Sequence, residues 1–245
     1  MKNYKIEIQY EGTRFQGWQR QTSTDNTIQG KLEAVLTKMC GYSVEINGAG
    51  RTDAGVHAYM QVANFSIDTE RSADEIMKYL NQYLPEDIAV VAIEEADERF
   101  HARLRAKGKH YRYRIRTAKT RDVFSRRYVY ALGETLDIAA MREAAAILSG
   151  EHDFKAFTSN HRMKKSTVRR IRIEITQTEE EIILDYTGDG FLYHMVRILT
   201  GTLIEVGRHE RSVEGLEAVL ASKERSQAGY LVPAEGLTLM EVYYE

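Results

Sequence analysis

The segment from Gly48 to Ala58 combines one carboxylate with a nearby guanidinium and three glycines. Three glycines within eight positions allow a positive φ or a close approach to a ligand, which an ordinary strand or helix would not need. Because Arg51 lies two residues before Asp53, we expect the aspartate to be ionised. An ionised aspartate can act as a nucleophile or as a base. The alternative is a structural aspartate that accepts backbone N–H groups and closes a glycine-rich turn.

His57 follows Asp53 by four residues and is a second candidate for chemistry. A single histidine in a glycine-rich loop is more often a hydrogen-bonding framework residue, so we do not assign it a catalytic role. An aspartate and a histidine at this spacing could begin a metal site, but no third ligand follows at a recognisable spacing. Cys40 is the only cysteine, which excludes an intrachain disulfide and a cysteine cluster for zinc. The sequence therefore predicts no metal.

Charges are unevenly distributed along the chain, although the net charge is only −2. Residues 67–98 carry ten acidic and two basic side chains, whereas residues 99–116 carry eight basic side chains and no acidic one. A second basic run without acids spans residues 162–172. Phosphate binding depends on charge within about 8 Å at physiological salt, so local density outweighs net charge. Nucleic acid is therefore a candidate partner, and the alternative is that both runs are solvated faces.

The first part of the chain predicts the element order βαββαβ. The expected elements are a strand, a helix ending at Gly41, two strands flanking the glycine-rich loop, a helix with a capping box, and a buried strand, at residues 2–10, 28–41, 44–47, 61–66, 72–83 and 88–93. This order is that of the ferredoxin-like fold, in which an antiparallel sheet packs against two helices and leaves its other face open to a ligand.

A similar series of elements begins again after a polar crossover at 103–109. Residues 110–117 alternate, with aromatic and aliphatic side chains on one face and three arginines on the other. The remaining expected elements are a helix, two strands of a hairpin, two helices and a final strand, at residues 137–148, 171–175, 182–186, 191–206, 213–221 and 237–244. We predict an α+β protein of two ferredoxin-like (RNA-recognition-like) domains, 1–103 and 104–245, sharing a mainly antiparallel sheet with helices on one side and a central RNA-binding cleft.

The amino terminus alternates in polarity where a signal peptide would carry an apolar stretch, and no later run reaches membrane-spanning length. Together with the single cysteine, this pattern predicts a soluble, unprocessed protein of the cytoplasm, without a membrane partner.

Several separated segments, taken together, resemble the tRNA pseudouridine synthase A (TruA) family. They follow one another in the family's order over nearly the whole chain, and the Gly-Arg-Thr-Asp-Ala-Gly-Val-His string is the most specific of them. The segments are Tyr10-Glu-Gly-Thr-Arg-Phe-Gln-Gly-Trp-Gln-Arg20, Ala49-Gly-Arg-Thr-Asp-Ala-Gly-Val-His57, Phe100-His-Ala-Arg103, His110-Tyr-Arg-Tyr113, Asp153-Phe-Lys-Ala-Phe157, His194-Met-Val-Arg197 and Glu235-Gly-Leu237.

The resemblance implies an enzyme that isomerises uridine to pseudouridine at positions 38, 39 and 40, in the anticodon stem and loop of tRNA. It also implies a homodimer that needs no metal or organic cofactor. Asp53 matches the catalytic nucleophile, and Arg197 matches the arginine that pairs with this carboxylate and orients it. Tyr111 matches the tyrosine that stacks on the target base.

Each of these residues also has a structural interpretation. Tyr111 could be a core tyrosine, Arg197 a surface arginine on an apolar helix, and Arg51 a partner in a structural salt bridge instead of a base-flipping or phosphate-binding residue. Phe15 and Trp18 could either contact RNA or anchor their loop to the domain. The candidates for contacts with the RNA backbone are Arg14, Arg20, Arg103, Arg105, Lys107, Lys109, Arg112 and Arg114.

Pseudouridine formation needs one carboxylate, which attacks C1′, adds to uracil C6 or removes a proton from C2′. Glycosidases normally use a second carboxyl group as an acid, and the Gly48–Ala58 segment offers none, which favours isomerisation over hydrolysis. Two other functions remain as alternatives. A noncatalytic RNA-binding protein of paired RNA-recognition-like domains would have no need of Asp53, and a nucleoside hydrolase would release uracil.

Overall fold

The computed structural model describes residues 1–160 and 166–244 and divides the chain into two units. The first unit consists of Met1–Lys107 together with Thr238–Glu245, and the second unit consists of Gly108–Leu237. The chain therefore returns to its first unit at the end, so that the last strand lies with the amino-terminal half. The expected domain boundary after residue 103 would instead assign this last strand to the carboxy-terminal domain.

The first unit has the strands and helices of the predicted βαββαβ order. In chain order they are β1 (Lys2–Tyr10), α1 (Ile28–Cys40), β2 (Asn47–Gly48), β3 (His57–Ile67), α2 (Ala73–Tyr83) and β4 (Ile88–Ala96), with β10 (Leu237–Tyr243) added at the end. β1 lies between β4 and β3 and is antiparallel to both. On its side away from β1, β3 pairs with two strands. β2 is antiparallel to it and β10 is parallel to it.

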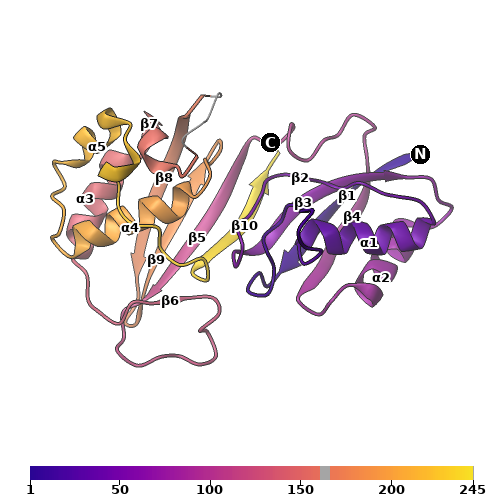
Figure 1. The fold of residues 1–245 in the computed structure, drawn as a ribbon, viewed down its shortest axis with the longest axis horizontal. Helices are drawn as coiled ribbons and strands as arrows, with labels where there is room; N and C mark the ends of the chain where they lie inside the picture. The colour runs from indigo at the N-terminus through magenta and orange to yellow at the C-terminus, as the bar shows by residue number, and fades with distance from the viewer. Residues whose placement is uncertain (161–165, 245) are drawn as a thin grey trace. The chain divides into compact units, whose positions relative to one another are not determined.

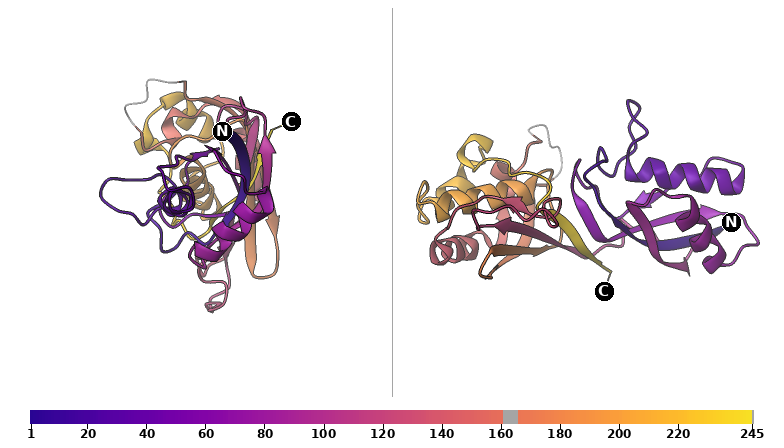
Figure 2. Two further views of the ribbon diagram at one scale, coloured as in Figure 1. Left: turned by 90° about the vertical axis from the view of Figure 1, so that its right-hand side faces the viewer. Right: turned by 90° about the horizontal axis from the view of Figure 1, so that it is seen from below.

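Helices α1 and α2 lie on the same side of this sheet (Figures 1 and 2). The side chains of β1 alternate accordingly, with Tyr4, Ile6, Ile8 and Tyr10 buried. Local sequence defines the helix ends: Gly41 takes a φ of 77° after α1, and Ser72 and Glu75 form the predicted capping box at the start of α2.

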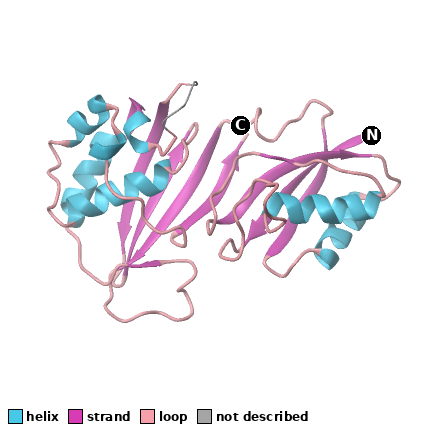
Figure 3. Ribbon diagram, viewed as in Figure 1, coloured by secondary structure: helices cyan, strands magenta, loops and turns pink. Residues whose placement is uncertain are grey.

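The second unit is also a mostly antiparallel sheet with helices packed against it (Figure 3). Its sheet runs in the order β5-β9-β8-β7, and the short β6 pairs in parallel with the end of β5. The elements are β5 (Gly108–Arg116), β6 (Tyr130–Ala131), α3 (Ile138–Leu148), β7 (Gly150–Asp153), the 3-10 helix η1 (Phe154–Phe157), β8 (Val168–Gln177), β9 (Glu181–Gly188), α4 (Met195–Gly207), α5 (Leu216–Ser222) and the 3-10 helix η2 (Arg225–Gln227). The two units together confirm the predicted α+β class.

Several expected elements differ in detail from the structure, and β3 begins at His57, four residues before its expected start. The expected strand at 44–47 is only the two-residue β2, because the N–H groups of Val44 and Ile46 donate to side chains of α1, those of Thr37 and Glu33. β4 is not a buried strand, since only its first residues are covered and Val91 is 43% exposed. Helix α4 begins four residues later than expected, after His194 at a φ of 65°. The sequence patterns did not predict β6 or β7.

No helix within the described residues is long and apolar enough to cross a membrane.

Candidate active site

Asp53 lies on the connection from β2 to β3, and backbone hydrogen bonds hold this connection on both sides. The Ala49 N–H donates to the Val62 carbonyl (2.7 Å), and the Trp18 N–H donates to the Thr52 carbonyl (3.0 Å). After Asp53 the chain turns sharply, with the Val56 N–H donating to the Asp53 carbonyl (3.2 Å) and Gly55 at a φ of 81°. The carboxylate is therefore carried on a fixed loop, and its residue is only half-buried.

The segment 11–18 packs directly against this loop, backbone on backbone. A Cβ on Gly12 would lie 2.0 Å from the Val56 carbonyl oxygen, and one on Gly17 would lie 2.6 Å from the Thr52 carbonyl oxygen. Real Cβ atoms do not approach this closely, so both positions need glycine. The two glycines of the Tyr10–Arg20 motif therefore shape the loop that carries Asp53.

A buried polar cluster supports the residues just before Asp53. The hydroxyl groups of Tyr10 and Thr52 are hydrogen-bonded at 2.8 Å, and the Gln61 amide donates to the Gly50 carbonyl (3.0 Å). Burial raises the pKa of Tyr10 to about 12, so its hydroxyl stays protonated at neutral pH. These bonds fix the glycine-rich backbone from the sheet side.

His57 joins the two packed segments. It is buried, and its Nδ1 accepts the N–H of Gly12 (2.9 Å). The same Nδ1 lies 3.5 Å from a carboxylate oxygen of Glu11. The geometry gives His57 the role of a framework residue.

Phe15 and Trp18 are buried against the first unit, so they anchor their loop and do not project into solvent. Trp18 lies close enough to Gly48 that a Cβ there would come within 2.5 Å of the indole ring. The structure thus resolves the alternative that the sequence left open for these two aromatic residues.

Arg51 is exposed, and its Nε donates to the side-chain carbonyl of Gln19 (2.9 Å). A chain of polar contacts continues from Gln19 to Gln29 (2.7 Å) and from Gln29 to Glu33 (2.9 Å). Glu33 also forms an ion pair with Arg20 (2.9 Å). Within the described residues Arg51 itself forms no ion pair, so its guanidinium is oriented by an amide and its charge is not neutralised by a carboxylate.

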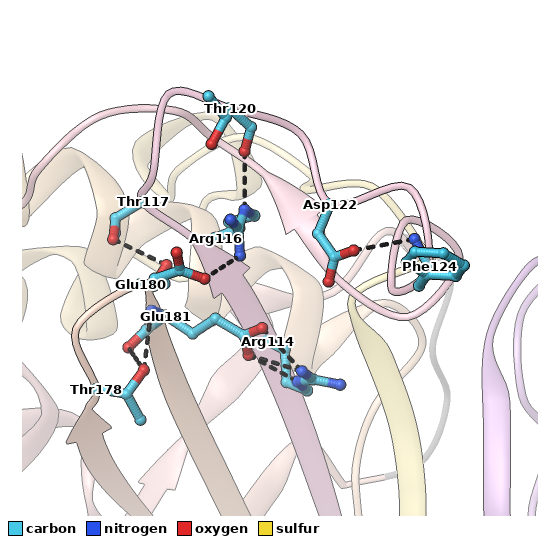
Figure 4. A network of polar contacts seen from close by, with 9 residues as sticks. All are labelled: Arg114, Arg116, Thr117, Thr120, Asp122, Phe124, Thr178, Glu180 and Glu181. Atoms are coloured by element: carbon cyan, nitrogen blue, oxygen red, sulfur yellow. Dashed lines mark hydrogen bonds and ion pairs between the residues drawn. The ribbon is translucent and has the colours of Figure 1, made fainter.

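The arginines of β5 are paired with acids of the neighbouring strand β9 and of the turn before it. Asp185 of β9 accepts from Arg112 through both of its oxygens (2.9 and 3.1 Å). Figure 4 shows Arg114 bonded to Glu181, with contacts of 2.9 and 2.8 Å, and Arg116 bonded to Glu180 at 2.7 Å. The arginine face of β5 is therefore locally compensated, which lowers its capacity to attract phosphate.

The loop before β5 is also basic, but among the described residues its charges are not paired as those on the arginine face of β5 are. Arg103, Arg105 and Lys107 are exposed, and none of the three forms an ion pair within the described part of the chain. Side chains from the core hold their loop: Asn64 accepts the Ala102 N–H (2.9 Å), and the Tyr244 hydroxyl donates to the Ala102 carbonyl (2.8 Å). This loop presents uncompensated charge on an ordered backbone.

The other candidates for backbone contacts have mixed surroundings. Arg14 lies 3.7 Å from carboxylate oxygens of Glu86 and Asp87, and Lys109 is half-buried. In the 162–172 run, Arg170 and Arg172 pair with Glu151 and Glu174. Arg162, Lys164 and Lys165 lie outside the described residues.

Tyr111 belongs to the second unit and is nearly buried there. Its ring packs edge-on against Phe191, with ring centroids 5.1 Å apart and planes at 83°. It stands opposite Tyr186 in the β5–β9 ladder. The aromatic ring is therefore rigidly held, as a stacking platform requires, and the same packing would suit a core tyrosine.

Arg197 lies in the first turn of α4 and is half-buried. Its Nε donates to the carbonyl oxygen of Val232 (2.8 Å). A cation in the first turn opposes the helix dipole, so this position does not serve helix stability.

Among residues 1–160 and 166–244, no group of three or more histidine, cysteine, aspartate and glutamate side chains is arranged to hold a metal ion.

Comparison with known proteins identifies the family. The family model described as tRNA pseudouridine synthase matches residues 6–104 and 144–245. The chain is 44% identical to "tRNA pseudouridine synthase A 2" of Bacillus cereus (strain ZK / E33L) over 100% of both chains, and 45% identical to "tRNA pseudouridine synthase A 1" of Clostridium tetani, also over 100% of both. A search of solved structures gave a Cbf5-Nop10-Gar1 complex at a TM-score of 0.38 and 12% identity, covering 82% of this chain and 45% of that one.

The chain therefore belongs to the tRNA pseudouridine synthase family. It is an isomerase, and tRNA is the substrate of the family.

The sequence interpretation singled out Asp53 but missed the residues that shape its loop. Tyr10, Gly12 and Gly17 lie far from the loop in sequence, whereas Gln61 lies in β3, just after it. The two glycines carry the only visible signal, as close neighbours in one motif.

Proposed function

We propose that this enzyme converts uridine to pseudouridine at positions 38, 39 and 40 of the tRNA anticodon stem and loop, with Asp53 as the nucleophile. The observation that carries the proposal is the setting of Asp53, a half-buried carboxylate on a loop fixed by Trp18, Val62 and the packed glycines. Such a loop holds a reacting group in place before the substrate arrives.

In this reaction the carboxylate attacks C1′ of the ribose and the C1′–N1 bond breaks, so that the electron pair of that bond leaves with uracil. The uracil turns while still in the site and C5 bonds to C1′ as the carboxylate departs. The proton on C5 is then lost and N1 gains one, so that the overall change is an isomerisation. Addition to C6 and removal of a C2′ proton are the two other routes. All three use one ionised carboxylate and no redox step.

The target nucleotide of a stem must leave its stack before a carboxylate reaches its sugar, which costs a few kcal/mol. Stacking on an aromatic side chain returns about 1–3 kcal/mol per base, and we assign this role to Tyr111. We assign to Arg197 the pairing with Asp53, which would orient the carboxylate and keep it charged. This role gives a reason for a guanidinium at the unfavourable end of α4. Arg51 remains a candidate for a contact with the RNA beside the flipped base.

We further propose a cytoplasmic homodimer that needs no metal or organic cofactor. The tRNA substrate of the family supports a cytoplasmic enzyme, and the reaction as written is complete without any group beyond the protein.

Mapping of the product tests the proposed specificity. An unmodified tRNA transcript with uridine at 38, 39 and 40 is incubated with the enzyme, and pseudouridine is located by its carbodiimide adducts, which stop reverse transcription. We expect pseudouridine at these positions, none in a transcript carrying cytidine there, and no free uracil. Pseudouridine only elsewhere in the tRNA would refute the assignment, and free uracil would indicate hydrolysis.

We expect the basic loop before β5 to bind RNA phosphates more strongly than the arginines of β5 do, because those arginines are already paired with carboxylates. Replacing Arg103, Arg105 and Lys107 together by glutamine should weaken tRNA binding and lower the slope of log K against log salt by about 2, at about 0.7 per lost contact.

The control is the Arg112→Gln, Arg114→Gln double variant, whose arginines are already paired with Asp185 and Glu181. Its salt slope should change by less than about 1. If the double variant lowers the slope as much as the triple variant does, the ion pairs of β5 open on RNA binding. The basic loop would then not be the stronger phosphate contact of the two.

A further inference from the structure

Residues 117–129 connect β5 to β6 as a loop that extends from the second unit (Figure 1). β6 pairs with the last residues of β5, Ile115 with Tyr130, so the chain leaves the sheet and returns to the same place. The loop takes no part in the site described above.

Apolar side chains on this loop are exposed to an unusual degree. Phe124 is 92% exposed, Val123 is 58% exposed and Tyr128 is 41% exposed. One exposed apolar residue needs no explanation, but three on one short segment mark a surface that meets something else.

The same loop carries four basic side chains and one acidic one, Asp122. Lys119, Arg121 and Arg126 are exposed, and within the described residues none of them forms an ion pair. This arrangement contrasts with the arginines of β5, each of which has a carboxylate partner.

The loop is held in a defined conformation at several points. Arg116, which is nearly buried, donates through Nε to the Thr120 carbonyl (2.9 Å), and the Thr117 N–H donates to the Glu180 carbonyl (2.9 Å). The Phe124 N–H donates to the Asp122 carboxylate (3.0 Å), as Figure 4 shows. The Tyr128 N–H donates to the Ser125 carbonyl (2.8 Å). The exposed ring therefore sits on an internally bonded turn.

We infer that residues 117–128 form a second RNA contact, in which Phe124 stacks on an unpaired base of the tRNA while Lys119, Arg121 and Arg126 contact phosphates. The combination of an aromatic platform with uncompensated cations is how proteins bind single-stranded nucleic acid without reading its sequence. The inference rests on the tRNA substrate of the proposed function and adds a contact distinct from the reacting base.

A second copy of this chain is the competing partner. A stable protein interface buries about 800 Å² on each side, with an apolar centre. Three exposed apolar side chains among four cations fall short of such a centre, whereas RNA supplies both negative charge and planar bases. The observations therefore favour RNA.

The test compares Phe124→Ala and Phe124→Trp in the full chain. Both variants are titrated against an unmodified tRNA transcript at about 150 mM salt, and Kd is measured by fluorescence anisotropy. We expect the alanine variant to bind about 5-fold to 150-fold more weakly, since base stacking is worth about 1–3 kcal/mol. Tryptophan should restore binding. Because Phe124 is almost fully exposed, neither change should alter the melting temperature.

Tyr83→Ala is the matched control, because Tyr83 is a 45% exposed aromatic residue in the acidic part of the first unit. Its Kd for tRNA should remain that of the wild type. Wild-type pseudouridine formation on the same transcript is measured in parallel, so that failure of the proposed activity is seen separately from failure of this contact.

Two outcomes would overturn the inference. One is a Kd for Phe124→Ala equal to that of the wild type. The other is a change of oligomeric state for Phe124→Ala in light scattering without RNA, which would assign the surface to a second copy of the chain.

Discussion

Replacement of Asp53 by asparagine is expected to lower the rate of pseudouridine formation by at least about 10⁴-fold, while tRNA binding is retained. Removal of a nucleophile has effects of this order in enzymes that form covalent intermediates. Asparagine has nearly the same shape as aspartate and leaves the main-chain bonds of the loop in place, including the bond from Val56 to the carbonyl of residue 53. Single-turnover rates and Kd for one tRNA transcript, measured side by side, check this prediction.

Asp25→Asn is the matched control, since Asp25 is an exposed aspartate in a loop of the same unit. It should react at the wild-type rate. Near-wild-type turnover of Asp53→Asn would remove the nucleophile from the account. If Asp53→Asn instead lost binding and activity together, Asp53 would serve the structure of the loop, which is the alternative interpretation of a glycine-rich turn.

Replacement of Arg197 by glutamine is the second change with a large expected effect, on the order of 10²-fold in kcat with little change in KM. The reason is that a residue that orients the nucleophile acts in the chemical step and not in RNA binding. Arg197→Lys should recover only part of the rate, because an ammonium group keeps the charge but cannot form two parallel bonds to a carboxylate.

Loss of the bond from Arg197 to the Val232 carbonyl could lower stability by itself, so a structural control is needed. Arg225→Gln provides it, because Arg225 binds the neighbouring carbonyls of Ala228 and Gly229 (3.3 and 2.9 Å). Both variants should lose a few degrees in melting temperature. Only Arg197→Gln should lose kcat, and equal kcat values for the two would assign Arg197 to structure alone.

Local sequence signals were sufficient for most of the fold. The alternation of β1, the positive φ of Gly41 after α1 and the Ser72–Glu75 capping box all depend on residues within one element, and each was predicted from a few adjacent positions. The expected strand at 44–47 was wrong, because side chains of α1 occupy its N–H groups. A contact between separate elements leaves no mark in the pattern of one strand.

Prediction of the candidate site also succeeded for residues that are neighbours in sequence and failed for contacts between separate elements. Asp53 was found because its glycines, Arg51 and His57 are neighbours in sequence. The supports of its loop were not found, since Tyr10 and Gln61 reach Thr52 and Gly50 from other strands.

The basic runs show most clearly that pairing between distant segments cannot be read from the sequence. The arginines at 112, 114 and 116 looked like one uncompensated run. Their acidic partners lie more than sixty residues away on β9 and in the turn before it, and only the strand pairing brings them together.

The central claim is that the carboxylate of residue 53 meets the ribose of a uridine that has left its stack. A crystal structure of the Asp53→Asn protein with the anticodon arm of tRNA tests this claim most directly. The account predicts an extruded uridine with C1′ within about 3–3.5 Å of the side-chain oxygen at position 53, the distance of a near-attack geometry. A uridine still stacked in the stem, or a side chain at position 53 enclosed by protein atoms and distant from every sugar, would contradict it.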